Sequence, residues 1–263
     1  MSSFSPLSTP TPEVIAYHGW GLGSNCWHTL VRSALRRGWS FQAYDRGYFP
    51  FSLFDNSPSG IPKSLDPQFS ATPGPKLLLT HSYGLHLCSP HLLQQANALI
   101  ILSGFAHFHP RDELAQKQSR RRVDRMIQQL EQDPMAVLQQ FWVNTVAPQS
   151  WNSLWSPLSS SPYPDPVLIN ALALPTLLQD LRDLQNQSLS LESLRKIPRI
   201  LLIHGTADTI VALDRSETLV KDLIRLGHSR VTLRAIEGAG HGLPLTHGTT
   251  CWDIIEPWWS VED

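Results

Sequence analysis

The sequence has little of several features that mark particular classes of protein. It holds 3 cysteines (Cys26, Cys88 and Cys251), an odd number without paired spacing, which predicts reduced thiols and no disulfide framework. Charged residues make up only 16% of the 263 residues, and 21 basic side chains nearly balance 22 acidic ones, for a net charge of −1. That balance excludes a protein-wide positive field that gathers nucleic acid.

Long apolar segments and targeting features are also missing. No apolar run approaches the ~20 residues that a membrane-spanning helix needs, so we expect no contact with a membrane. Residues 1–12 have neither a basic start nor an apolar centre, which indicates a disordered leader and not a secretory signal. Together with reduced thiols, these features predict a cytoplasmic protein.

The sequence does contain a series of short apolar runs, each followed by a turn. They cover residues 14–17, 41–44, 77–80, 99–102, 200–203 and 231–236. Runs of this length without alternation indicate strands that are buried on both faces, as in a parallel sheet. Helix-length segments, such as 27–37 and 216–226, lie between several of them. We therefore predict an α/β fold with a mostly parallel central sheet flanked by helices.

Two stretches interrupt this alternation. Residues 50–75 are rich in proline and serine, and the sequence predicts no role for them. Residues 105–195 contain no strand pattern and indicate helices around a Ser/Pro-rich loop at 156–166. An insertion of this length is typical of a lid or binding element. We predict a core formed by residues 13–104 and 196–263, with a helical cap at 105–195.

A candidate nucleophile lies in the segment Thr80-His81-Ser82-Tyr83-Gly84, where a predicted strand meets a helix start. This approximates the small-x-Ser-x-Gly nucleophile elbow, in which a strained turn projects the serine hydroxyl above the sheet. Gly84 fits the requirement for a small residue, whereas Thr80 is bulkier than the usual glycine. Leu85 also stands where a second glycine is common. The alternative interpretation of Ser82 is a helix N-cap.

A candidate acid and base follow two later strands. Asp208 lies after the run 200–203, and His241 lies in Gly238-Ala239-Gly240-His241-Gly242 after the run 231–236. Alone, each is an ordinary turn or surface residue. The chain order Ser82, Asp208, His241 is the order found in α/β-hydrolases. In that arrangement His241 takes the serine proton, and Asp208 orients the imidazole and stabilises its cation.

A candidate oxyanion hole follows the first predicted strand, in His18-Gly19-Trp20-Gly21. The glycines allow the backbone to turn so that an N–H points at the nucleophile. We predict that the backbone N–H groups of Trp20 and Tyr83 hold the oxyanion. The Trp20 side chain is then free to line an acyl pocket, although plain core packing is the alternative.

These four pieces resemble the α/β-hydrolase superfamily, and the resemblance extends from residue 14 to about residue 259. Within it, residues 18–27, which begin His-Gly-Trp-Gly-Leu and end in a tryptophan, look like the pimeloyl-[acyl-carrier-protein] methyl ester esterases of biotin synthesis. Asp45-Arg46-Gly47 departs from the usual pattern of that family, so this chain looks like a divergent member. The resemblance implies a serine carboxylesterase that hydrolyses the methyl ester of pimeloyl-acyl-carrier protein through an acyl-enzyme.

The predicted cap contains an amphipathic helix at residues 111–130. Its apolar arc consists of Val123, Met126, Ile127 and Leu130, and its basic face consists of Lys117, Arg121, Arg122 and Arg125. The basic face is either solvated or a docking site for an acidic partner. Acyl carrier protein is acidic and bears a phosphate, which arginine binds well. The related esterases meet their carrier protein through cap arginines, so the resemblance implies the docking role.

The remaining expectations concern the ligands and the alternatives. Trp20, Phe141 and Trp142 are candidates for the walls of the substrate pocket. We expect no cofactor and no metal, because His107 and His109 have no third ligand motif nearby, and we expect a monomer. The alternative functions are a broad-specificity carboxylesterase or acyl thioesterase for short or medium chains, and a catalytically idle receptor with a hydrolase fold.

Overall fold

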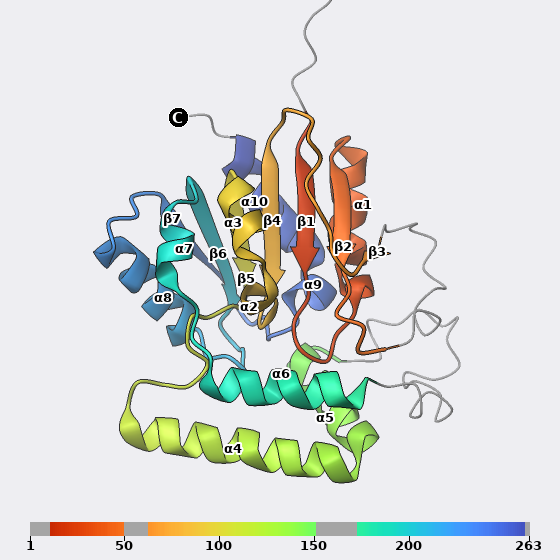
Figure 1. The fold of residues 1–263 in the computed structure, drawn as a ribbon, viewed down its shortest axis with the longest axis vertical. Coiled ribbons are helices and arrows are strands. Elements are labelled where there is room, and N and C mark those ends of the chain that lie inside the picture. The colour runs from red at the N-terminus through yellow and green to blue at the C-terminus, as the bar shows by residue number, and fades with distance from the viewer. Residues whose placement is uncertain (1–10, 50–62, 151–172, 261–263) are drawn as a thin grey trace, which may run out of the picture.

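The structure is a computed structural model that describes residues 11–49, 63–150 and 173–260. Strands and helices alternate along the chain, with a run of helices in the middle (Figure 1). In order, the elements are β1 (Glu13–Tyr17), η1 (Ser24–Trp27), α1 (His28–Arg36), β2 (Ser40–Tyr44), β3 (Lys63–Ser64), β4 (Lys76–His81), α2 (Gly84–Leu87), α3 (Pro90–Gln95), β5 (Ala98–Leu102), α4 (Glu113–Gln132), α5 (Pro134–Val146), α6 (Leu174–Asn186), α7 (Leu191–Arg195), β6 (Arg199–Gly205), α8 (Asp214–Arg225), β7 (Val231–Ile236), α9 (Leu243–Thr246) and α10 (Gly248–Ser260).

The strands form a sheet in the order β3-β2-β1-β4-β5-β6-β7, and every neighbouring pair is parallel. The central strands β4, β5 and β6 are buried along nearly their whole length, as their unbroken apolar runs predict. All six predicted strands are present, and the α/β fold class is confirmed. The edge strand β3 was not predicted, because a pairing of 2 residues leaves no pattern in the sequence.

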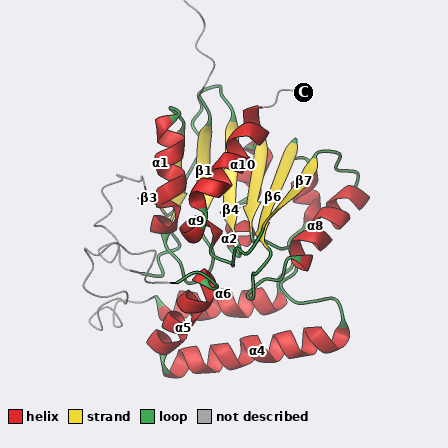
Figure 2. Cartoon of the chain, turned by 180° about the vertical axis from the view of Figure 1, so that it is seen from behind, coloured by secondary structure: helices red, strands yellow, loops and turns green. Residues whose placement is uncertain are grey.

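Helices cover both faces of the sheet (Figure 2). One face carries α1, α9 and α10, which contact one another. The other face carries α3, α7 and α8, of which α7 contacts both α3 and α8. Because the strands are buried on both faces, their alternate side chains supply two separate apolar cores. Ala16 and Leu79 belong to one core, whereas Ile15 and Leu78 belong to the other.

The inserted helices α4, α5 and α6 lie beyond the carboxyl ends of the strands, where Figure 1 shows them crossing below the sheet. The predicted helix at 111–130 is α4, and it begins after Asp112, whose side chain accepts a hydrogen bond from the N–H of Ala115 at 2.8 Å. Val123 and Leu130 are buried, so the predicted apolar arc of this helix faces inward. Residues 105–195 contain no strand within the part that the structure describes.

Polar contacts fasten α6 to the core. The carboxylate of Asp180 is buried and accepts two hydrogen bonds from Arg46, at 2.9 and 2.8 Å. The hydroxyl of Tyr48 donates a third to the same carboxylate at 2.6 Å. One turn earlier in α6, the carbonyl of Leu177 accepts a hydrogen bond from the Trp20 indole at 2.9 Å. The segment after β2 therefore helps to hold the cap in place.

Some sequence predictions fall outside the described residues. These are most of the leader at 1–12, the loop at 156–166 and the first half of the proline-rich stretch at 50–75. Within the described ranges, no helix combines the length and the apolarity needed to cross a bilayer.

Candidate active site

The turn after β4 holds Ser82 in a strained conformation. Its φ angle is 52°, in the left-handed region that non-glycine residues rarely adopt. The Ser82 N–H donates to the carbonyl of Leu102 at 2.9 Å, which ties the turn to the end of β5. Such strain persists only where the surroundings over-determine it, and it clusters at functional positions.

Close packing on both sides of the turn explains its sequence. A Cβ on Gly84 would lie 2.2 Å from the carbonyl oxygen of Tyr17, so only glycine allows α2 to pass the end of β1. A Cβ on Gly19 would come within 3.0 Å of the Ser82 Cβ. Thr80 occupies the position where a smaller residue is usual, and its buried hydroxyl donates to the carbonyl of Ile100 at 3.3 Å. Threonine is therefore accommodated here, because the strand carbonyl accepts the hydrogen bond of its buried hydroxyl.

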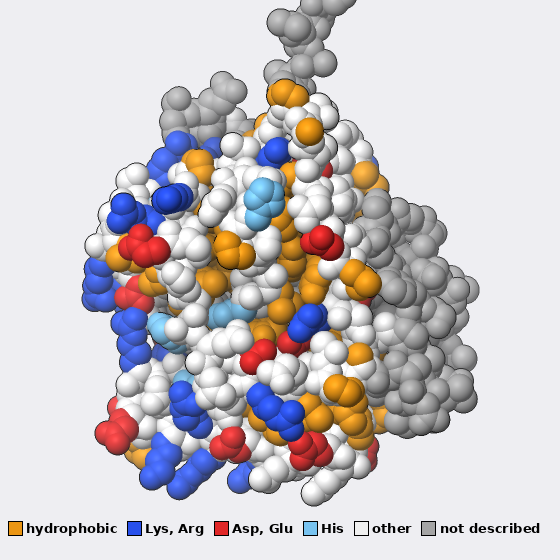
Figure 3. All heavy atoms as spheres, viewed as in Figure 1, with side chains coloured by type: hydrophobic (Ala, Val, Ile, Leu, Met, Phe, Trp, Pro, Cys, Tyr) orange, Lys and Arg blue, Asp and Glu red, His pale blue; other side chains and the backbone are white. Residues whose placement is uncertain are grey.

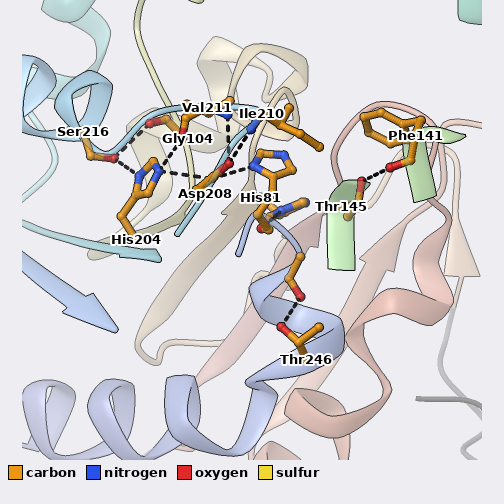
Figure 4. Close-up of polar contacts among 12 residues, drawn as sticks. His81, Gly104, Phe141, Thr145, His204, Asp208, Ile210, Val211, Ser216 and Thr246 are labelled. Carbon is orange, nitrogen blue, oxygen red and sulfur yellow. Dashed lines mark hydrogen bonds and ion pairs between the residues drawn. The ribbon is translucent and has the colours of Figure 1, made fainter. Parts of the chain in front are cut away.

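Asp208 lies at the carboxyl edge of the sheet, beside His204, Ile210 and Val211 (Figure 4). His241 is in contact with it. His241 Nδ1 is 2.8 Å from Asp208 Oδ2. A carboxylate only accepts, so Nδ1 carries the hydrogen and Nε2 of the neutral ring is left as a proton acceptor. The other carboxylate oxygen, Oδ1, accepts the backbone N–H groups of Ile210 and Val211, both at 2.9 Å.

Asp208 stays ionised although it is buried. Burial alone would raise the pKa of its carboxyl, but the charge of His241 and the hydrogen bonds from His204 and His241 outweigh this effect and lower the pKa well below its usual range. The ionised carboxylate accepts the Nδ1–H of His241 and fixes the orientation of its ring. This is the arrangement that a base needs when it must accept a proton during a reaction.

The glycines around His241 allow its loop to pack against the cap. A Cβ on Gly240 would lie 1.7 Å from the carbonyl oxygen of Ala147, at the end of α5. The N–H of Gly242 donates to the carbonyl of Thr145 at 2.7 Å. The cap therefore fixes the loop that carries His241, and the glycine-flanked pattern has a steric cause.

His81 supports the same loop from beneath. Its Nε2–H donates to the backbone carbonyl of His241 at 3.0 Å, and the two rings lie 4.9 Å apart between centroids. Burial, and next the neighbouring His241, lower the pKa of His81 to about 3. His81 is therefore neutral at ordinary pH and adds no second positive charge beside His241.

Two backbone N–H groups are available next to Ser82. Those of Trp20 and Tyr83 have no hydrogen-bond partner in the described part of the chain. His18 Nε2 accepts the N–H of Arg46 at 3.0 Å, so His18 donates from Nδ1 to the carbonyl of Gly19 at 2.9 Å. In a planar trans peptide the N–H points opposite to the carbonyl. The bond from His18 therefore fixes the direction of the Trp20 N–H.

A cavity of about 300 Å³ between core and cap is lined by both Ser82 and His241. The other lining residues are Trp20, Tyr83, Phe108, Val123, Met126, Gln129, Val137, Gln140, Phe141, Asn144, Leu181, Leu184 and Ile210. Trp20 and Phe141 meet edge to face, with 4.9 Å between centroids. The third predicted wall residue, Trp142, does not line this cavity, because its indole points to the core and donates to the carbonyl of Gly21 at 2.7 Å.

The predicted basic face of α4 is exposed. Lys117, Arg121, Arg122 and Arg125 all reach solvent, and none forms an ion pair within the described ranges. Figure 3 shows basic side chains along the lower edge of the molecule, where α4 lies. Arg122 and Arg125 share a stripe of the helix with Gln129, which lines the cavity. The basic face therefore belongs to the same helix that supplies Val123, Met126 and Gln129 to the cavity.

Several residues around the site were not predicted. Arg46 and Asp180 are 134 residues apart in sequence, and no local pattern connects them. His204 contacts Asp208. The sequence offered one signal for it: His204 directly precedes Gly205 in the segment that leads to Asp208. His109, by contrast, bonds Ser119 through Nδ1 at 2.9 Å, and no cluster of three or more metal-binding side chains occurs among the described residues.

Comparisons with known proteins identify the fold. The chain matches solved structures of a bromoperoxidase from Bacillus anthracis (TM-score 0.65, 16% identity, 96% of this chain and 93% of that one) and an esterase from Exiguobacterium antarcticum (TM-score 0.63, 17% identity, 96% and 93%). It also matches a thermophilic esterase from Thermogutta terrifontis (TM-score 0.59, 13% identity, 95% and 90%). The chain therefore has the α/β-hydrolase fold.

Sequence comparison is less informative. Residues 177–249, which include Asp208 and His241, match the family model of the prolyl oligopeptidase family. No curated protein matches the chain. The matches to solved structures show the fold alone and give no support for a link to biotin synthesis.

Proposed function

We propose that this protein is a serine carboxylesterase that cleaves esters of short or medium acyl chains through an acyl-enzyme. One observation carries the proposal: the strained Ser82 shares a cavity with His241, whose Nδ1 is held by the buried carboxylate of Asp208. Strain, base and acid occur together at the carboxyl edge of the sheet, where α/β folds hold their ligands. The esterase folds among the structural matches favour the same class.

The proposed mechanism gives each of these groups one role. Ser82 Oγ attacks the ester carbonyl while His241 Nε2 takes its proton. The N–H groups of Trp20 and Tyr83 stabilise the negative oxygen of the tetrahedral intermediate. The C–O bond to the alcohol breaks, and His241 returns the proton to the departing oxygen. Water then attacks the acyl-Ser82 ester with His241 again as base, which releases the acid and restores the hydroxyl of Ser82.

The cavity indicates the kind of acyl group. Its walls are mostly aliphatic and aromatic, and none of its lining residues is charged. A volume of about 300 Å³ lies at the lower end of the range for ligand pockets. The acyl chain is therefore neutral and apolar, and of short or medium length. A thioester of the same acyl group would react by the same steps.

The test is hydrolysis of p-nitrophenyl esters from acetate to laurate by the wild type and Ser82→Ala. We expect the wild type to prefer a short or medium chain and Ser82→Ala to lose activity by at least about 1,000-fold, because the nucleophile is absent. Ser103→Ala is a matched control, since Ser103 is also a buried serine with a positive φ angle (49°). Equal activity of the wild type and Ser82→Ala would refute the proposal.

A second candidate is narrower: the methyl ester of pimeloyl-acyl-carrier protein. The exposed basic face of α4 favours it, because four cations without ion pairs in the described structure suit an acidic carrier. The triple variant Arg121→Glu, Arg122→Glu, Arg125→Glu should lower kcat/KM for the carrier-linked ester and leave that for p-nitrophenyl butyrate unchanged. Equal effects on both substrates, or no turnover of the carrier-linked ester by the wild type, would leave only the broader esterase.

A further inference from the structure

We propose that His204 is a positioning residue that holds the carboxylate of Asp208 and sets the pH range in which His241 acts as a base. The proposal rests on the function proposed above and extends it to a second histidine on the same carboxylate. His204 lies on β6, four residues before Asp208, and is fully buried. It does not line the cavity that contains Ser82, so it acts on the reaction only through Asp208.

The ring of His204 has a defined hydrogen on the side of Asp208. Its Nε2 lies 2.8 Å from the carbonyl oxygen of Val211 and 3.2 Å from Asp208 Oδ2. Both of these atoms only accept hydrogen bonds, so Nε2 carries a hydrogen that the two oxygens share. Asp208 Oδ2 thus lies within reach of two histidines, His241 at 2.8 Å and His204 at 3.2 Å. Figure 4 shows the contact between His204 and Asp208.

The other side of the ring is fixed by α8. Nδ1 of His204 lies 2.7 Å from the hydroxyl oxygen of Ser216, and that hydroxyl lies 3.1 Å from the carbonyl oxygen of Gly104. Ser216 is fully buried as well. A continuous polar chain therefore runs from the loop after β5 through Ser216 and His204 to Asp208 and His241. Four separate elements of the core hold the carboxylate in one orientation.

This chain has an electrostatic consequence. The N–H of His204 stabilises negative charge on Asp208 Oδ2, so the carboxylate attracts the proton of His241 less strongly. We therefore expect that loss of the His204 N–H raises the pH at which His241 begins to act as a base. Two other titratable groups face this pair. His81 has its ring 4.9 Å from that of His241, and Asp214 lies at the start of α8, where its pKa is lowered first by Arg215 and to a lesser extent by His204.

The experiment is the pH profile of kcat/KM for p-nitrophenyl butyrate with His204→Phe. We expect the acidic limb to move up by about one pH unit, the scale of one hydrogen bond to a charged group. The plateau should fall about 10- to 100-fold, because the base is less well placed. His228→Phe is the matched control. His228 is also buried and contacts a backbone carbonyl through Nε2 (Ile197, 2.8 Å), so its loss should lower stability without moving the limb.

Two further variants separate positioning from folding. His204→Gln retains an N–H donor and should return the limb toward its wild-type position. Ser216→Ala keeps the imidazole of His204 and should move the acidic limb in the same direction as His204→Phe, but by a smaller amount. If His204→Phe does not fold, Ser216→Ala tests the inference in its place. If a variant is folded and its Ser82 still reacts with a fluorophosphonate, but its acidic limb is unmoved, the inference about His204 is wrong and the proposed function still stands. A wild type that neither hydrolyses the ester nor reacts with the fluorophosphonate would overturn the proposed function with it.

Discussion

Replacement of Asp180 by asparagine tests how firmly the cap is attached to the core. Asp180 is 1% exposed and accepts two hydrogen bonds from Arg46 and one from Tyr48. Asp180→Asn keeps the volume but removes the charge, so two donors lose a charged partner. Breaking a buried pair costs about 3–5 kcal/mol. Because the Arg46 side chain is 31% exposed, water recovers part of this cost, and we expect a loss of about 2–3 kcal/mol.

The measurement is urea unfolding followed by tryptophan fluorescence, together with thermal unfolding. A loss of that size predicts a drop in Tm of roughly 5–10 °C. The KM for esters should also rise, because Leu181 and Leu184 of the same helix line the cavity. Asp183→Asn is the control, since Asp183 lies on the same helix and its carboxylate accepts a hydrogen bond from Gln179 but forms no ion pair among the described residues. If Asp180→Asn were within about 0.5 kcal/mol of the wild type, the idea of a fastened cap would be wrong.

Four further changes have defined outcomes. Gly84→Ala would place a methyl group 2.2 Å from the Tyr17 carbonyl, so urea unfolding should show a loss of about 1–3 kcal/mol, and unchanged stability would contradict the packing described for the turn. Because the pKa of Asp208 is lowered in the folded state, its contribution to stability is present above about pH 4 and is lost on acidification. Asp208→Asn should therefore flatten the acid side of the stability curve, and a curve parallel to the wild type would count against this. The pKa of His81 is lowered to about 3 in the folded state, so the free energy of unfolding should fall as pH drops from about 6.5 toward 3. His81→Gln should reduce that fall, and an unchanged slope would exclude His81 as its source. Val137→Phe narrows the cavity and should shift the preference among p-nitrophenyl esters to shorter chains, whereas an unchanged preference would place the acyl chain elsewhere.

Much of the fold was predictable because the strands are local and distinctive. Apolar runs such as that of β5 have only one way to be buried, between two layers of helix, and turn residues mark where they end. The same reasoning located Ser82, Asp208 and His241, because each directly follows a strand and parallel strands end at the same edge. Their roles in catalysis stay a prediction until they are tested.

The rest depends on contacts between distant segments. In the sequence, nothing distinguishes Asp180 from the other polar residues of an amphipathic helix, because its partner Arg46 is brought to it only by the fold. Phe141 and Trp142 are adjacent aromatic residues, and sequence alone could not tell that one lines the cavity while the other packs behind it. His204 was overlooked for a similar reason: its neighbour Ser216 belongs to the next helix, and the shared carboxylate appears only once β6 and its loop are in place.

The central claim is that Ser82 is an activated nucleophile, and reaction with a fluorophosphonate followed by intact-mass and peptide mass spectrometry tests it most directly. The account predicts one adduct per chain, located on Ser82, that is absent from Ser82→Ala and from heat-unfolded protein. It also predicts much slower labelling of His241→Ala, because the base that takes the serine proton is missing. Folded wild-type protein that remains unlabelled, or that is labelled elsewhere while Ser82→Ala keeps its esterase activity, would contradict the claim.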